Sequence, residues 1–267
     1  MSEVPILRDY ARAILNAYRN DATHMPALAA ELERMEACHR NWLAHHGAAE
    51  TGTADQEDFW RRCRSSLCAP CHTARTRDDA ADILSVFLDA MDDDEEEGEG
   101  LRPTIVTFKN RAYPLDDAEQ CVDDTITQWR RFSSRKHFKH AVAGYVRGVE
   151  LMTNHENGTV YTEVSALMLV RKTSQIEHAG GWLKLWRKAD DNNPAEKATF
   201  EQPDIDTREG YLSLVDFVSR VATVAVRPVH LCEEHPHGVV CDARKLKKIK
   251  AALSGRRLIL FSRRMRR

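Results

Sequence analysis

The sequence has no long apolar run and no internal repeat. A helix needs about 18 consecutive apolar residues to cross a bilayer, and no stretch of the 267 residues approaches that length. The first residues, MSEVPILRDYARAIL, lack the apolar stretch behind a basic start that marks a secretory signal. We therefore expect a cytoplasmic protein that does not span a membrane.

Acidic residues are missing from two basic blocks, and basic residues are missing from one acidic run. Residues 244–267 contain eleven Lys or Arg and no acid, and residues 130–147 contain six and no acid. Residues 89–99 hold eight acidic residues and no basic one, so the rest of the chain carries +6 although the formal net charge is −2. Two purely basic blocks predict a polyanionic partner, with nucleic acid as the first candidate. The alternative is a solvated helix face and a disordered tail.

The N-terminal third is predicted to be helical. Residues 6–46 carry apolar side chains at Leu28, Leu32, Met35 and Trp42, and a second helix is predicted over residues 78–91. The acidic run that follows is expected to be a disordered loop, because like charges repel and it has nothing apolar to bury. The prediction is three parts: a helical region over 1–91, an acidic linker over 92–100, and a main domain over 101–267 with a basic tail.

The main domain combines stretches with the periodicity of strands and stretches with the periodicity of helices. Asn157-Gly158 between two alternating runs is a strong hairpin signal, and residues 221–226 fit a strand as well as the end of a helix. The fold class expected is α+β, an antiparallel sheet flanked by helices, behind an N-terminal helical zinc-binding subdomain. Strands are predicted at 103–108, 145–152, 160–170 and 257–261, and helices at 116–135, 176–189, 210–226 and 243–253.

Seven cysteines in a chain without an export signal favour metal ligands or small buried hydrophobes over disulfides. Cys63, Cys68 and Cys71 follow a C-x4-C-x2-C spacing, in which one turn brings two thiolates to the same tetrahedral ion. A closed zinc site needs a fourth ligand. Cys38 is the preferred candidate, because the competing His72 is adjacent to Cys71, where side chains diverge. Three unremarkable buried cysteines are the alternative, whereas a redox motif is disfavoured because no βαβ pattern surrounds them.

Several stretches resemble, in the same order, the replication proteins of rolling-circle plasmids, a branch of the HUH endonucleases. RMEACHRNWLAHH and WRRCRSSLCAPC resemble the upstream cysteine and the cysteine-rich knuckle of that family, and PTIVTFKN resembles its first core strand. TQWRRFSSRKHFKHAVAGYVRGVELMTN, GWLKLWRKA and LSGRRLILFS resemble a helix with its strand, a Trp-rich helix and a C-terminal strand. The resemblance covers roughly residues 30–262 and implies binding to plasmid origin DNA.

The resemblance also implies a catalytic site that this sequence lacks. In the family, alternating histidines on the strand after the hairpin hold a divalent metal, and a helical Tyr attacks DNA to form a covalent intermediate. Here Tyr161, Glu163 and Ser165 stand at the histidine positions, and Phe217 stands at that of the Tyr. Ser213 falls where the resemblance suggests a Glu.

Other tyrosines and carboxylates keep an atypical site open. Tyr211 lies six residues before Phe217, about 600° around a helix, and so points to a different face. If Asn157-Gly158 centres the hairpin, Glu150 faces Ser165, and Glu150 and Glu163 lie diagonally on one face. Two carboxylates there could bind Mg²⁺ or Mn²⁺, although solvated or salt-bridged glutamates are the preferred interpretation.

Two further groups of residues have candidate roles. The stretch His230–Cys241 holds three His and two Cys, and an exposed polar loop is preferred over a second zinc site because the spacing fits no standard pattern. The basic blocks supply side chains for phosphates rather than base edges. The DNA-binding residues expected are Arg130, Arg131, Arg135, Lys136, Lys139, Arg147, Arg256 and Arg257.

We therefore expect a DNA-binding, zinc-containing protein that resembles plasmid replication initiators and is impaired or inactive as a nickase. One alternative is an active metal-dependent nickase built from Glu150, Glu163 and either Tyr211 or Tyr161. Another is a zinc-stabilised interaction protein that does not bind DNA.

Overall fold

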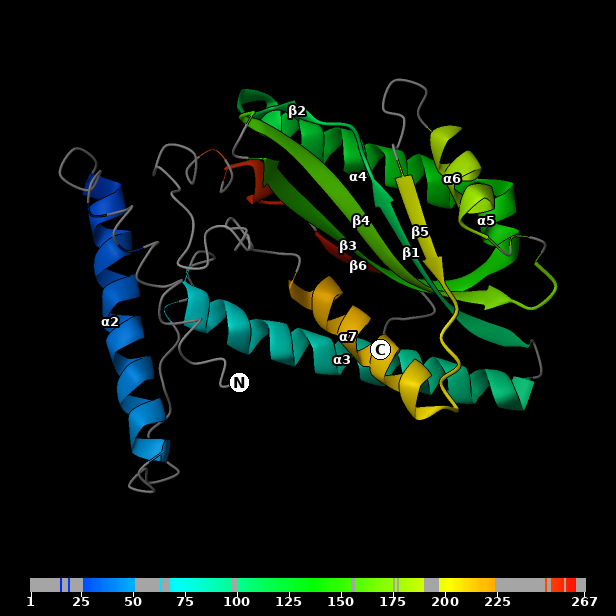
Figure 1. Cartoon of the computed structure of the whole chain (residues 1–267), viewed down its shortest axis with the longest axis horizontal. Coiled ribbons are helices and arrows are strands. Elements are labelled where there is room, and N and C mark those ends of the chain that lie inside the picture. The colour runs from blue at the N-terminus through cyan, green and yellow to red at the C-terminus, as the bar shows by residue number, and fades with distance from the viewer. Residues whose placement is uncertain are drawn as a thin grey trace. The chain divides into compact units, whose positions relative to one another are not determined.

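The computed structural model divides the chain into two compact parts. One comprises residues 1–75 and 228–247, and the other comprises residues 76–227 and 248–267. Helix α3, Ala69–Glu97, begins in the first part and continues into the second (Figure 1). The structure describes residues 15, 19, 26–50, 63, 68–97, 100–154, 157–174, 176, 178–189, 197–223, 248, 251–256 and 258–262.

Helix α2, Pro26–Glu50, forms most of the described first part. Its buried residues Leu32, Met35, Cys38 and Trp42 recur three or four positions apart, the spacing of one helix face. The prediction of a helix over 6–46 is therefore confirmed for residues 26–46, and the helix continues four residues further.

The acidic run is helical up to Glu97, so the predicted loop is wrong over that stretch. Ile83, Phe87 and Ala90 of α3 are buried in the core of the second part, and packing holds the helix from which the acidic turns extend. Glu is also a good helix former, which offsets part of the repulsion between like charges. Gly100, at φ 65°, then turns the chain into the sheet. The division at residues 91 and 100 stays a prediction.

An antiparallel sheet forms the centre of the second part, as predicted. Its main path runs β5-β1-β4-β3-β6, and β2 pairs with β4 off that path. The predicted strands at 103–108, 145–152 and 160–170 lie in β1, β3 and β4, and that at 257–261 is observed as β6 over residues 259–261. Strands β2 and β5 were not predicted. The strands are β1 Leu101–Lys109, β2 Tyr113–Pro114, β3 Val142–Asn154, β4 Thr159–Arg171, β5 Lys197–Glu201 and β6 Ile259–Phe261.

Helices cover both faces of the sheet (Figure 1). On one face lie α4, Ala118–Ser134, α5, Lys136–Ala141, and α6, Ala179–Arg187; on the other lie α3 and α7, Arg208–Thr223. Strand β4 serves both layers, because successive side chains of a strand point to opposite faces. Val164 and Met168 enter the core under α4 and α6, while Leu167 and Leu169 enter the core with α3 and α7. None of the described helices is both long and apolar enough to cross a membrane.

Aromatic side chains fill the core beneath α4 and α6. Trp186 stacks on Phe108 with ring centroids 4.5 Å apart and planes within 6°. Phe132 meets the same two rings edge-on, at 5.6 Å and 5.3 Å, and Trp129 lies 5.4 Å from Phe132. These fully buried rings are supplied by β1, α4 and α6, so they join the sheet to both helices.

A buried polar network lies beside these rings. The Asn110 amide donates to Thr125 Oγ1 at 3.0 Å and to Thr162 Oγ1 at 3.1 Å, and Trp186 Nε1 donates to Asn110 Oδ1 at 3.1 Å. The two threonine hydroxyls are 2.6 Å apart, and Thr125 also donates to the Cys121 carbonyl at 2.9 Å. All four side chains of this network, from Asn110, Thr125, Thr162 and Trp186, have no exposed surface. Buried polar groups of this kind stabilise one arrangement only when all are satisfied.

Asn110→Leu should lower the free energy of unfolding by about 2–3 kcal/mol, because it leaves the Trp186 N–H and the threonine hydroxyls with fewer partners. Urea unfolding of the purified protein measures the change. Asn41→Leu, at an exposed position of α2, is the control and should stay within about 0.5 kcal/mol. A loss in Asn110→Leu no larger than in the control would show that the network does not stabilise the fold.

Candidate functional site

Four cysteine side chains meet in the first part of the chain. Cys38 comes from the middle of α2, Cys63 and Cys68 precede α3, and Cys71 lies in the first turn of α3. The sulfur of Cys71 is 3.4 Å from that of Cys38 and 3.5 Å from that of Cys63, and Cys68 lies 3.7 Å from Cys38. All four sulfurs lie within 4.8 Å of one another. These four residues could hold a metal ion, and they are the four ligands that the sequence predicted.

The donor set fits a tetrahedral ion. Zinc–sulfur bonds of about 2.3 Å in a tetrahedron place the sulfurs about 3.8 Å apart, close to the separations observed. Hydrogen bonds from the thiols of Cys63, Cys68 and Cys71 lower the pKa of Cys38, which favours a thiolate within the group. The side chain of His72, the competing ligand, lies outside the described residues. Zinc bound here would join α2 to the start of α3 and contribute to folding.

The hairpin register differs from the prediction. Glu150 pairs with Glu163 and Gly148 pairs with Ser165, so the register lies two residues from the expected one. The connection spans residues 155–158, and Asn157 Oδ1 accepts hydrogen bonds from Thr159 N at 3.2 Å and Oγ1 at 2.6 Å. Since the side-chain period of a strand is two, a shift of two leaves the faces unchanged. Glu150 and Glu163 are therefore on one face, directly opposite rather than diagonal.

The positions where the resemblance predicts histidines lie on the same sheet face as α7. Leu167 and Leu169 of β4 pack in one core with Phe217 of α7. Alternation along β4 therefore places Tyr161, Glu163 and Ser165 on that face too. Lys109 Nζ lies 4.5 Å from the centroid of the Tyr161 ring, and Thr107 Oγ1 lies 3.2 Å from Ser165 Oγ.

Helix α7 presents an apolar side chain at the position where the resemblance predicts the nucleophile. Phe217 is 1% exposed and packs with its neighbours Leu214 and Val218. Tyr211 is 40% exposed, consistent with the different helix face expected for it. Ser213 hydrogen-bonds the carboxylate of Glu201, at the end of β5. The described part of α7 thus directs no hydroxyl group of a tyrosine into the core that it shares with β4.

The Glu150–Glu163 pair supplies two carboxylates and no third ligand. Among the described residues, the four cysteines are the only group of three or more His, Cys, Asp or Glu side chains close enough to share an ion. A magnesium or manganese site at the glutamates therefore stays a hypothesis. The stretch 230–241, with its histidines and cysteines, lies outside the described residues.

Most of the predicted DNA-binding residues in the first basic block are at the surface. Arg130 and Arg131 are exposed near the end of α4, and Lys136 and Lys139 are exposed on α5. The Arg135 guanidinium is half-buried and donates to the Lys188 carbonyl, next to α6.

Arg147 is not at the surface. It is 2% exposed, and its guanidinium donates to the Leu258 carbonyl at 2.8 Å. Burial lowers its pKa to about 10, which leaves the group charged at neutral pH. The same carbonyl accepts from Val149 N at 3.1 Å. Arg147 thus holds the C-terminal segment against β3, and its burial is at odds with the predicted phosphate contact.

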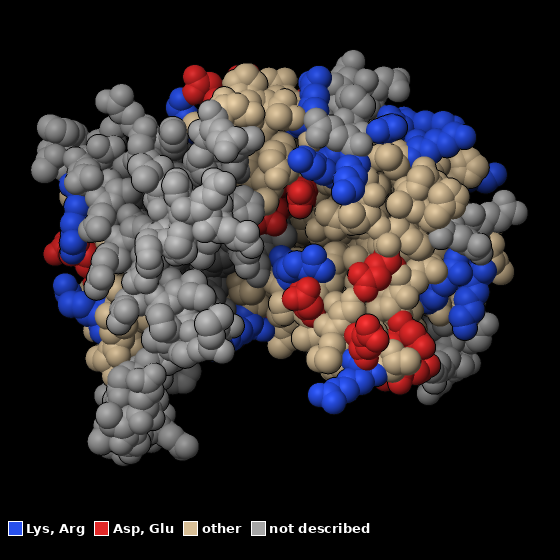
Figure 2. Space-filling model, in the orientation of Figure 1, with Lys and Arg blue, Asp and Glu red and all other residues tan. Residues whose placement is uncertain are grey.

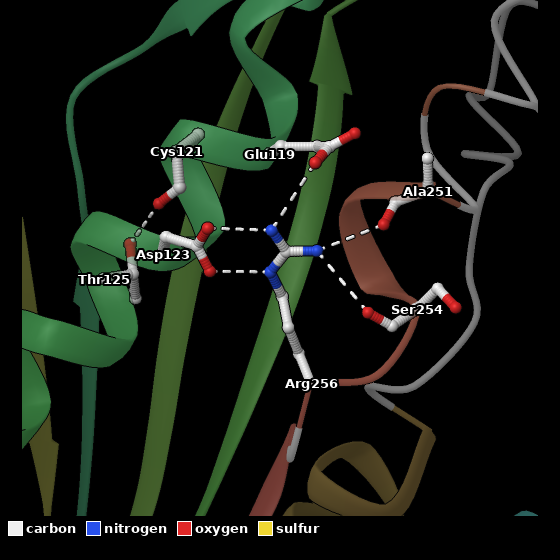
Figure 3. Close-up of polar contacts among 7 residues, drawn as sticks. All are labelled: Glu119, Cys121, Asp123, Thr125, Ala251, Ser254 and Arg256. Carbon is white, nitrogen blue, oxygen red and sulfur yellow. Dashed lines mark hydrogen bonds and ion pairs between the residues drawn. The ribbon is translucent and has the colours of Figure 1, made fainter.

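Arg256 is committed to an ion pair within the protein (Figure 3). Its guanidinium forms two bonds to the Asp123 carboxylate, at 2.6 Å and 2.7 Å, and lies 3.7 Å from Glu119. Hydrogen bonding to Arg256 lowers the pKa of Asp123 below its usual range. Arg256 therefore fastens the C-terminal segment to α4, a role that the basic composition of that segment did not indicate. Arg257 lies outside the described residues.

Sequence reasoning missed one group of basic side chains. Lys184, Arg187 and Lys188 are exposed along α6 and its C-cap, and with Gly180 and Leu183 they line a hollow of about 400 Å³. The sequence feature that could have revealed them is helical spacing, which places these cations on one side of the helix and Trp182 and Trp186 on the other. Both tryptophans are fully buried and anchor their side of the helix. Gly180 and Gly181 are weak helix formers, so a helix with one apolar and one charged side was less evident in the sequence there.

Comparison with known proteins identifies the family. The profile of a family described as "Replication protein" matches residues 58–267, well over half of the chain. Comparison with curated proteins and with solved structures gives no match. The matched range includes the whole sheet with α7, on whose common face the predicted catalytic positions lie. The chain therefore belongs to the replication protein family, that of the plasmid rolling-circle replication initiators.

Proposed function

We propose that this protein is a DNA-binding replication initiator-like protein with a structural zinc ion, and that it is impaired or inactive as a nickase. The observation that carries the proposal is the pairing of a family match over residues 58–267 with a buried Phe217 on the helix where the resemblance places the nucleophile. Phenylalanine has no oxygen with which to attack a phosphate. The chain then acts as a regulator or accessory factor at plasmid DNA rather than as the enzyme that opens it.

DNA binding is supported by charge rather than by base-reading residues. Exposed arginines and lysines at the end of α4 and on α5 are suited to backbone phosphates, which position a protein on DNA without reading its sequence. Residues 125–149 contain no acid to offset them. Such binding is accompanied by the release of counterions and is therefore weakened by salt.

Wild-type protein should bind a random 30-base-pair duplex, with affinity falling at least about 100-fold between 50 and 200 mM KCl, because four phosphate contacts alone produce about that loss. Fluorescence anisotropy at four salt concentrations measures the slope. The variant Arg130→Gln/Arg131→Gln/Lys136→Gln/Lys139→Gln should bind more weakly with a shallower slope. Absence of binding at 50 mM KCl would favour the alternative of a zinc-stabilised interaction protein.

No covalent protein–DNA adduct should form with supercoiled plasmid DNA or with a random pool of single-stranded oligonucleotides, in the presence of Mg²⁺ or Mn²⁺. The reason is that Phe217 lacks the nucleophilic oxygen and the strand lacks histidines. Denaturing gel electrophoresis detects an adduct by its mobility. An adduct that forms in wild type and disappears in Tyr161→Phe or Tyr211→Phe would show that the chain is an active nickase with an atypical site.

The purified protein should contain one zinc per chain, and Cys71→Ser should lose it, because a closed tetrahedral site needs all four thiolates. Chelation should also lower the thermal unfolding temperature. Cys121→Ala is the matched control: this cysteine is fully buried in α4 and is not one of the four clustered cysteines. Mass spectrometry of the purified proteins measures the number of zinc ions per chain. A metal-free wild type, or loss of zinc in Cys121→Ala, would contradict the assignment.

A further inference from the structure

Helix α6 divides sharply into an anchored side and a charged side. Trp182 and Trp186 are fully buried, and Trp186 Nε1 is hydrogen-bonded to Asn110 Oδ1 at 3.1 Å. Lys184 and Arg187 on the helix and Lys188 at its C-cap are exposed. Because the tryptophans fix the rotation of the helix, the three cations are held in one direction.

These cations border a concave surface. The hollow of about 400 Å³ is lined by the three basic residues together with Gly180 and Leu183. An arginine fork binds a phosphate group through two parallel hydrogen bonds, and a lysine adds a point charge. Gly180 has no side chain to fill the hollow. The surface therefore suits an extended anion that enters between charged side chains.

The charged side of α6 is continuous with the basic surface of α4 and α5. The Arg135 guanidinium, between α4 and α5, donates to the Lys188 carbonyl. Neither residues 125–149 nor residues 178–189 contain an acidic residue. Figure 2 shows blue side chains gathered over the region where Figure 1 draws α6, with no red side chain among them. Over the described residues this surface carries charge of one sign, and such a surface attracts a polyanion.

This surface lies on the sheet face opposite α7. The tryptophans of α6 belong to the core that also holds Val164 and Met168 of β4. Phe217 belongs to the core on the other face, the face to which Tyr161, Glu163 and Ser165 also point. The basic surface and the degenerate catalytic positions are therefore separated by the thickness of the sheet.

We propose that Lys184, Arg187 and Lys188, together with the basic residues of α5, bind the phosphate backbone of DNA on the helical face opposite the degenerate catalytic positions. The proposal rests on the proposed function and specifies where on the chain DNA is held. DNA bound here does not contact the face of Tyr161, Glu163 and Phe217. Exchange of the reactive side chains on that face therefore leaves the affinity for DNA intact.

Two triple variants of equal charge test the assignment. Lys184→Gln/Arg187→Gln/Lys188→Gln removes three cations from α6, and Arg77→Gln/Arg208→Gln/Arg220→Gln removes three exposed cations from α3 and α7 on the opposite face. The α6 variant should bind the random duplex at least about tenfold more weakly at 100 mM KCl. Its salt slope should fall by about 2–3, at about 0.9 per lost phosphate contact. The control should change affinity less than about twofold.

Hydrogen–deuterium exchange on the unsubstituted protein gives a second measurement that does not depend on the variants folding. Saturating duplex should slow exchange in peptides from α5 and α6 and leave residues 208–223 unchanged. If wild type binds but the α6 variant binds equally well, the proposal is wrong and the proposed function stands. If the control weakens as much as the α6 variant, the assignment to one face is wrong. If wild type does not bind at 50 mM KCl, both are wrong.

Discussion

The buried network of Asn110, Thr125, Thr162 and Trp186 is the constraint on which the arrangement of the sheet and its helices depends. It joins the end of β1 to α4, β4 and α6, and every one of its side chains is excluded from water. An unsatisfied polar group at that depth costs about 1–3 kcal/mol, so the four elements cannot slide past one another without loss. The network therefore fixes the positions of these four elements relative to one another as well as stabilising the fold.

The orientation of both candidate faces follows from this one constraint. Thr162 points into the core under α4, and because neighbours on a strand point oppositely, Tyr161 and Glu163 point to the face of α7. Trp186 is held by Asn110, so Lys184, Arg187 and Lys188 point away from the core on the other face. A one-residue shift of β4 would turn Tyr161 and Glu163 to the other face of the sheet. A rotation of α6 about its axis would bury its three cations. The orientation of the predicted catalytic positions and of the basic surface is thus set by the residues of the buried network, which belong to neither group.

Sequence reasoning succeeded where one periodicity dominated a segment. The helix after Asp116 and the helix around Phe217 each bury one clear face, and the strand at 103–108 is rich in β-branched residues. The C-x4-C-x2-C spacing identified the cysteines that meet Cys38. It failed where contacts between segments distant in the sequence determine the local structure. Strand β5 reads KATFE, a short alternation with charged ends, and is formed by pairing with β1. The acidic turns of α3 extend a helix held by Phe87. The burial of Arg147 and the ion pair of Arg256 depend on a C-terminal segment that returns from more than a hundred residues away.

A phenylalanine at position 217, where the resemblance predicts the nucleophile, suits the packing of α7 on the sheet. Phe217 lies in a core with Leu214, Val218 and Leu167, and the Arg220 guanidinium lies 5.5 Å from its ring centroid. A tyrosine hydroxyl in such a core needs a hydrogen-bond partner, and burial without one costs free energy; phenylalanine makes the same apolar contacts without that requirement. Helix α7 therefore packs on the sheet without a tyrosine hydroxyl at position 217. Under the proposed function, the face of Tyr161, Glu163 and Phe217 has only a structural role, and the cysteine cluster and the basic surface provide metal and DNA binding.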